Sequence, residues 1–192
     1  NQSLNDSLLD PLLREGITHL WFVTLHPFDD GNGRITRTLT DLALAQMDEQ
    51  SIRLYAMSTA ILNKRKSYYE ILEQTQKNDS DITDWLVWFL DTLNDSLEKT
   101  LVQINRTLFK SQFWHKYSNL ALSEEQRKVL NRLLDGGENG FEHGISASQY
   151  QKVTKTSKAT ATRNLPDLLE KGCIVKLEGG GRNTRYQINT QL

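Results

Sequence analysis

Twelve consecutive residues near the start of the chain combine side chains that could catalyse phosphoryl chemistry. Positions 26–37 read His-Pro-Phe-Asp-Asp-Gly-Asn-Gly-Arg-Ile-Thr-Arg. His26 carries an imidazole, whose ordinary pKa of about 6.5 lets it take a proton from a hydroxyl at neutral pH. Asp30 carries a carboxylate, and Mg²⁺ beside a phosphate takes one or two such ligands and keeps several waters. The segment therefore predicts a general base and a Mg²⁺ ligand close together in the chain.

The residues that follow predict a site for a polyphosphate. The run Asp30-Gly31-Asn32-Gly33 disfavours a helix, whereas residues 34–46 favour one, which places the glycines at a helix N-terminus. There the first backbone N–H groups are unpaired, the helix dipole is positive, and missing Cβ atoms let a phosphate approach closely. Arg34 and Arg37 share one helical face and can donate charge-assisted hydrogen bonds to such a ligand.

Each of these features also has a structural interpretation when taken alone. A Gly-Asn-Gly run is often only a turn, a single histidine is usually a packing residue, and arginines on a helix are usually solvated. Their occurrence together within twelve residues favours the functional interpretation.

The segment matches every fixed position of the Fic signature, H-x-F-x-(D/E)-G-N-G-R-x-x-R, so the chain resembles the Fic family. That resemblance implies a mainly helical fold and transfer of AMP from ATP to a Ser, Thr or Tyr hydroxyl of a protein, with release of pyrophosphate. It implies that His26 deprotonates the target hydroxyl and that Asp30 holds Mg²⁺. Phe28 would be a buried anchor that pins the loop to the core.

The same resemblance assigns the phosphate contacts. The backbone of Gly31, Asn32 and Gly33 would cradle the α- and β-phosphates, while Arg34 and Arg37 would bind the β- and γ-phosphates. Doc-type kinases have Lys where this chain has Gly33, so this glycine favours nucleotidyl transfer over kinase chemistry. Transfer of UMP or phosphocholine, and removal of AMP, stay open because such family members share much of the motif.

Tyr68 and Tyr69 stand about where related Fic proteins carry a tyrosine pair near the adenine and ribose of ATP. An aromatic face suits a nucleobase, so the resemblance implies an ATP contact here. Ordinary helix core is an equally good interpretation of the pair. Related proteins often have Asn where Gln76 stands in this chain.

The residues before His26 predict one helix that must position the loop. Asp10 is a suitable N-cap and Pro11 a suitable first helical residue. The expected buried stripe consists of Leu12, Leu13, Ile17, Leu20, Trp21 and Thr24. Neither the flap hairpin nor the inhibitory helix of many Fic proteins is found before His26. Either the chain is a fragment of a longer protein, which we expect because residue 1 is not Met, or it is a trimmed version whose catalysis is impaired or unregulated.

The rest of the chain predicts a long closing helix and a second domain. Apolar residues at three- and four-residue steps indicate one helix over 82–108, broken at most once. Ser123 and Gln126 have the spacing of a capping box that opens the next helix. A short helix after Ile145, a second one from about Ser157 and a strand-turn-strand tail resemble a winged helix-turn-helix domain. The expected fold is thus mainly α: a Fic-type helical bundle over 1–117, followed by a small winged-helix (α+β) domain over 118–192.

The second domain carries a local positive charge. From residue 144 onward, the chain has eight Lys or Arg residues and three acidic residues, so this segment has a net charge of +5. Such a patch suits the phosphates of double-stranded DNA. The expected contacts are Lys158, Thr160, Thr162 and Arg163 in the major groove, and Arg182 and Arg185 on the wing. Use of the same domain for protein contacts or dimerisation is an equal alternative.

Composition sets the remaining expectations. The chain has 192 residues, a formal net charge of −1 and no apolar run near the roughly 20 residues that a membrane helix needs. Cys173, as the single cysteine, excludes an intrachain disulfide and favours the cytoplasm. The predicted function is a protein adenylyltransferase that uses ATP and Mg²⁺ on a protein substrate; self-modification and a homodimer stay open. The alternative is a DNA-binding transcriptional regulator whose Fic core senses nucleotide or is inactive.

Overall fold

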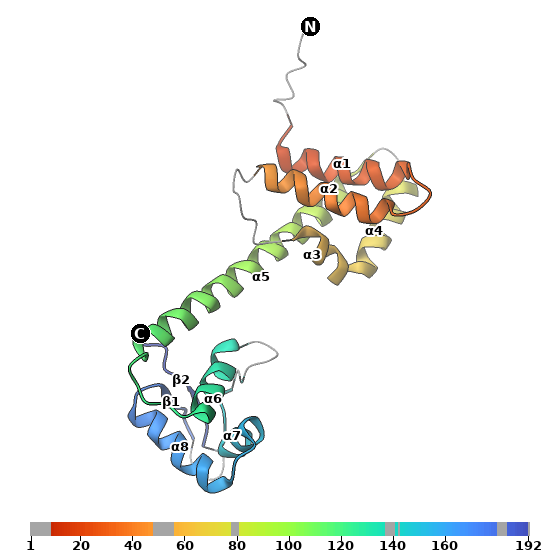
Figure 1. Cartoon of the computed structure of the whole chain (residues 1–192). Helices are drawn as coiled ribbons and strands as arrows, with labels where there is room; N and C mark the ends of the chain where they lie inside the picture. Colours follow the sequence, from red (N-terminus) through yellow and green to blue (C-terminus); the bar gives the residue numbers. More distant parts are fainter. Residues whose placement is uncertain are drawn as a thin grey trace. The chain divides into compact units, whose positions relative to one another are not determined.

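The structure is a computed structural model that describes residues 9–47, 56–77, 81–136, 141, 143–179 and 184–191. The mainly helical fold predicted from the sequence is confirmed (Figure 1). The chain divides into two compact units, residues 1–102 and 103–192. The helices are α1 (Pro11–Leu25), α2 (Asn32–Met47), α3 (Met57–Asn63), α4 (Arg65–Lys77), α5 (Thr83–Lys116), α6 (Glu124–Asp135), α7 (Ala147–Thr154) and α8 (Lys158–Glu170).

Helix α1 begins as its sequence predicts. The Asp10 carboxylate accepts a hydrogen bond from the Leu12 N–H (2.8 Å), and Pro11 occupies the first turn. The expected buried stripe was partly wrong, because Trp21 is 58% exposed and Thr24 is also exposed.

The buried face of α1 packs mainly on α2 and, at Gly16, also contacts α5. It consists of Glu15, Gly16, His19 and Leu20. A Cβ on Gly16 would lie only 3.0 Å from Leu86 Cδ2, and the Gly16 carbonyl accepts a hydrogen bond from the Trp85 indole (2.8 Å). Because successive helical residues point about 100° apart, a helix that buries Gly16 and Leu20 turns Trp21 outward.

Helix α2 packs on α1 through a face that is largely polar. Its buried residues, Asn32, Thr36, Thr40 and Leu44, recur every four positions. Leu39 and Leu42 lie outside this face and are 40% and 53% exposed. The Thr36 and Thr40 hydroxyls donate to the carbonyls of the preceding helical turn at 2.7 and 3.0 Å, which satisfies two buried polar groups within α2 itself.

The apolar core of the first unit gathers side chains from all five helices. The buried members are Leu20, Leu44, Met57, Ile61, Tyr68, Leu72, Trp85, Phe89 and Leu93. Helix α5 supplies Trp85, Phe89 and Leu93 and then runs on without the break that the sequence left open. Further along α5, Phe113 is buried in the core of the second unit.

The second unit is built from three capped helices and a hairpin. The capping box predicted at Ser123 is confirmed, and a second one forms between Ser146 and Gln149 at the start of α7. Lys155 ends α7 in the left-handed conformation, and Ser157 caps α8. Strands β1 (Ile174–Lys176) and β2 (Tyr186–Ile188) pair antiparallel, with Ile174 opposite Ile188. The helices and the strand pair expected in this region are therefore present.

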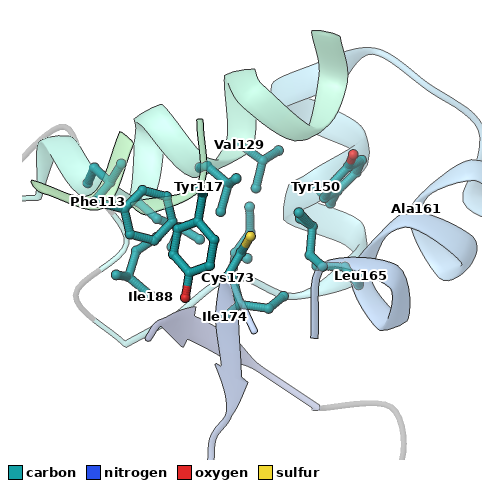
Figure 2. Close-up of a cluster of buried hydrophobic side chains, with 14 residues drawn as sticks. Phe113, Tyr117, Val129, Tyr150, Ala161, Leu165, Cys173, Ile174 and Ile188 are labelled. Carbon is teal, nitrogen blue, oxygen red and sulfur yellow. The ribbon is translucent and has the colours of Figure 1, made fainter. Parts of the chain in front are cut away.

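The core of this unit joins α5, the three helices and the hairpin, as Figure 2 shows. Its labelled members are Phe113, Tyr117, Val129, Tyr150, Ala161, Leu165, Cys173, Ile174 and Ile188. The Tyr117 hydroxyl donates to the Gly172 carbonyl (2.7 Å), which ties the end of α5 to the turn before β1.

Burial raises the pKa of the Cys173 thiol. Over the described residues, no helix is long and apolar enough to cross a membrane.

Candidate active site in the loop between α1 and α2

His26 lies at the point where α1 ends and the loop begins. Its backbone is left-handed, with φ 48° and ψ 55°, and its N–H donates to the Phe22 carbonyl (3.2 Å). Few residues other than glycine adopt this conformation, although histidine does so more readily than most. The turn stops the helix at His26 and leaves its side chain exposed. An exposed imidazole at a helix end can reach a hydroxyl on another molecule.

Asn32 holds the loop against the start of α2. Its side-chain oxygen accepts from the Phe28 N–H (3.0 Å), and its side-chain nitrogen donates to the Phe28 carbonyl. Asn32 is only 2% exposed, so this pair of bonds is a fixed part of the fold. The sequence assigned Asn32 a role through its backbone only; the structure adds a positioning role for its side chain.

The expected burial of Phe28 was wrong. Its ring is 50% exposed and lies beside Phe22, with ring centroids 6.2 Å apart. The loop does not need a buried ring, because the Asn32 amide already binds both backbone groups of Phe28.

The start of α2 presents backbone donors. Gly31 has a φ of +84°, and its carbonyl accepts from the N–H groups of Arg34 and Ile35, both at 2.9 Å. Within the described part of the chain, the N–H groups of Asn32 and Gly33 have no acceptor. Two free donors at the positive end of a helix are suited to an anion such as phosphate.

Two arginines and one carboxylate surround these donors. Arg34 Nη2 donates to Asp30 Oδ2 (3.1 Å), and both side chains are strongly exposed, at 74% and 91%. A Cβ on Gly33 would lie 3.4 Å from Arg37 Nη1, so this guanidinium lies beside the first turn of α2. An exposed ion pair is worth little and exchanges easily for a ligand. Arg34 and Asp30 can therefore part to meet a phosphate and a cation.

Asp30 is the carboxylate that lies beside these donors. No cluster of three or more His, Cys, Asp or Glu side chains that could hold a metal occurs in the described ranges. Mg²⁺ needs only one or two carboxylates when phosphates and water complete its shell. Asp30, with its Oδ1 turned to the Gly31 N–H (2.6 Å), is a carboxylate of this kind.

A buried polar network lies behind the loop. His19 Nδ1 is 2.8 Å from Thr40 Oγ1, and His19 Nε2 is 3.0 Å from the Tyr68 hydroxyl. Because the Thr40 hydroxyl donates to the Thr36 carbonyl, it accepts from Nδ1–H, and Nε2 then accepts from Tyr68. Burial, assisted by the positive charge of Arg37, lowers the pKa of His19 to about 4. His19 is therefore neutral at pH 7 and joins three helices.

The tyrosine pair is divided between the core and the surface. Tyr68 is 3% exposed and packs among Trp85 and Trp88, and burial raises its pKa to about 12. Its ring is thus a core element and offers no face to a nucleotide. Tyr69 is 54% exposed, with the Arg65 guanidinium 5.7 Å from its ring centroid. Of the two residues assigned to ATP, only Tyr69 presents a ring at the surface.

The side chains expected to contact DNA are also divided. Lys158, Thr162 and Arg163 are exposed on α8, whereas Thr160 is half-buried and its N–H donates to the Ser157 hydroxyl (3.2 Å). Arg185 is half-buried and donates to the Gly144 carbonyl (3.0 Å). Its guanidinium thereby joins the hairpin to the segment before α7.

Arg182 lies outside the described residues.

The sequence contains only a weak signal for this buried network. A histidine at position 19, on the predicted helix, and threonines four and eight positions after Asn32 form a polar series at helical spacing. Such a series normally indicates a solvated face, so only the packing of α1 on α2 identifies it as buried.

A comparison with protein-family models agrees with the motif. The model of the Fic/DOC family matches residues 2–44. The match includes α1, the His26 loop and α2 as far as Leu44. It supports a Fic domain in this part of the chain, around the site described above.

Proposed function

We propose that the chain is a protein adenylyltransferase that moves AMP from ATP to a Ser, Thr or Tyr hydroxyl of a protein. The observation that carries the proposal is the combination of an exposed His26 with two free N–H groups and two arginines at the next helix start. The family match supports a transferase of nucleotide-derived groups more generally. AMP transfer in particular is our inference from Gly33, which stands where the kinase branch has lysine.

In the proposed reaction His26 takes the proton of the target hydroxyl. The hydroxyl oxygen forms a bond to the α-phosphorus, and the bond from that phosphorus to the bridging oxygen breaks, which releases pyrophosphate. The N–H groups of Asn32 and Gly33 would bind phosphate oxygens, and Arg34 and Arg37 would offset the charge on the leaving group. Asp30 would hold Mg²⁺, which neutralises phosphate charge when bound.

The test uses ATP labelled at either the α- or the γ-phosphate, with Mg²⁺, the full chain and a cell lysate as the source of targets. We expect label from the α-position on protein, and its loss in His26→Ala. His115→Ala is the matched control, because His115 is also exposed but lies at the end of α5. Label from the γ-position would instead mean kinase chemistry, and equal turnover by His26→Ala would exclude the proposed base.

A second candidate function is DNA binding by the unit that contains α8. The observation in its favour is the exposure of Lys158, Thr162 and Arg163 on a helix that follows α7 after a short turn. We infer that this unit is a winged helix-turn-helix domain that uses α8 in the major groove.

Fluorescence anisotropy with duplex DNA at several salt concentrations tests this function. We expect affinity to fall steeply with salt and Arg163→Ala to weaken binding, while Lys99→Ala, an exposed change on α5, has little effect. Equal binding by Arg163→Ala and the unchanged chain would contradict the assignment of α8.

A further inference from the structure

A hollow between α6 and α7 has the size of a small-molecule site. These two helices pack against each other, and the cavity between them measures about 570 Å³. Pockets for small ligands commonly measure about 300–1,000 Å³. The lining residues are Lys128, Asn131, Arg132, Asp135, Phe141, Gln149, Lys152 and Val153.

The charged side chains of this hollow leave it positive. Lys128 and Arg132 come from α6 and Lys152 from α7, and none of the three has a carboxylate partner among the described residues. Among the described lining residues the one carboxylate, Asp135, pairs with Lys110 (2.6 Å). Three cationic groups therefore remain for a ligand.

The side-chain amides of Asn131 and Gln149 offer hydrogen-bond donors, rather than acceptors, to a ligand in the hollow. The Asn131 side-chain oxygen accepts from the Trp114 indole N–H (3.1 Å). The Gln149 side-chain oxygen accepts from the Ser146 N–H (2.9 Å) in the capping box. Each amide oxygen is thus engaged inside the fold, while the described residues offer no acceptor to either amide nitrogen. A hollow whose acceptors are used and whose donors are free selects an anion.

Phe141 and Val153 give the hollow an apolar wall, since both are half-buried and line it. We propose that this hollow binds a small organic anion, with a phosphate or carboxylate group held by the three cations and a flat apolar part against Phe141. The site is independent of the proposed AMP transfer, because all of its lining residues belong to the second unit. No residue of α8 lines it.

Two-dimensional amide NMR of the full chain tests the proposal with three probes: phenyl phosphate, inorganic phosphate and benzyl alcohol. We expect phenyl phosphate to shift the side-chain amide signals of Asn131 and Gln149 saturably, and the other two probes to bind at least about tenfold more weakly. Arg132→Gln and Lys152→Gln should each weaken phenyl phosphate about tenfold, as loss of a charge-assisted hydrogen bond does.

Lys176→Gln is the matched control, because it removes the same charge from an exposed position on β1 outside the hollow. Its affinity for phenyl phosphate should equal that of the unchanged chain. The same spectra report whether each variant is folded. Unchanged affinity in Arg132→Gln and Lys152→Gln would overturn the site, as would equal weakening by Lys176→Gln. Shifts caused by duplex DNA but not by phenyl phosphate would overturn it in favour of a nucleic-acid contact.

Discussion

At the scale of single residues, α1 and its C-cap carry two histidines in opposite environments. His26 is exposed at the helix end, whereas His19 is 1% exposed and hydrogen-bonded through both ring nitrogens. The sequence can suggest a role for His26 because neighbouring residues define the motif, and that role stays a prediction. It could not distinguish a surface from a core position for His19, because the partners of that ring come from distant helices.

The buried His19 predicts a pH-dependent stability. Its pKa is about 4 when folded and about 6.5 when unfolded, so between these values the unfolded chain binds more protons. Its contribution is complete above about pH 6.5 and is lost as the pH falls toward 4, by about 3 kcal/mol at most. Denaturant unfolding from pH 7 to 4 should show this loss.

The variant His19→Asn separates this effect from other groups. Burial raises the pKa of Glu15, so the folded chain binds more protons at this carboxyl than the unfolded chain does. Glu15 therefore raises the free energy of unfolding as the pH falls, which is opposite to the effect of His19. Glu15 stays in both proteins, so the difference between the two pH profiles reports on His19. Parallel profiles would show that His19 does not titrate differently on folding.

The Asn32 side chain predicts a stability effect that the motif alone does not. Asn32→Ala removes both hydrogen bonds to Phe28, and the free energy of unfolding should fall by about 1–2 kcal/mol. Thr38→Ala, an exposed change on the same helix, should cost less than about 0.5 kcal/mol. Equal unfolding midpoints for the two variants would show that the Asn32 clamp contributes nothing.

At the scale of helices, the sequence predicted where helices begin better than it predicted which of their faces are buried. The caps at Asp10, Ser123 and Ser157 depend on hydrogen bonds within three residues, so local sequence contains the whole cause. The buried faces depend on the partner helix. Trp21 was expected inside from its helical spacing, and Phe28 from the resemblance to the Fic family. The packing of Gly16 and the Asn32 clamp leave both rings exposed.

Helix α2 offers a direct test of its unexpected face. Leu42 is 53% exposed and Leu44 is 1% exposed, although they stand two positions apart. Leu42→Gln should change the free energy of unfolding by less than about 0.5 kcal/mol, and Leu44→Ala should lower it by about 2–5 kcal/mol. Chemical denaturation of both variants measures the contrast. A larger loss for Leu42→Gln would mean that α2 is rotated from the orientation described here.

At the scale of the whole molecule, two cores depend on different stretches of one helix. Phe89 is buried in the first unit and Phe113 in the second, and both belong to α5. The sequence predicted a long helix from its apolar spacing. It could not show which turns of that helix are buried, because burial depends on residues far away in the chain.

Because each unit has its own core, we expect a core substitution to destabilise mainly the unit in which it lies. Phe89→Ala and Phe113→Ala should each cost about 3–5 kcal/mol in the unit that loses the ring. Hydrogen exchange measured by mass spectrometry should show faster exchange in α1 and α4 for the first variant. For the second, it should rise in α6 and β1. Faster exchange throughout the chain in both variants would mean that the units unfold together.

The left-handed backbone at His26 restricts which amino acids this position can hold. Asparagine, aspartate, histidine and glycine tolerate that conformation best, whereas β-branched side chains are strained by it. Among these four residues, histidine is the one whose ordinary pKa lies near neutrality, as the proposed base requires. If His26 is that base, its backbone conformation and its chemistry both favour histidine. An alanine there tests both demands at once, and asparagine, which suits the backbone but cannot act as a base, tests the chemistry alone.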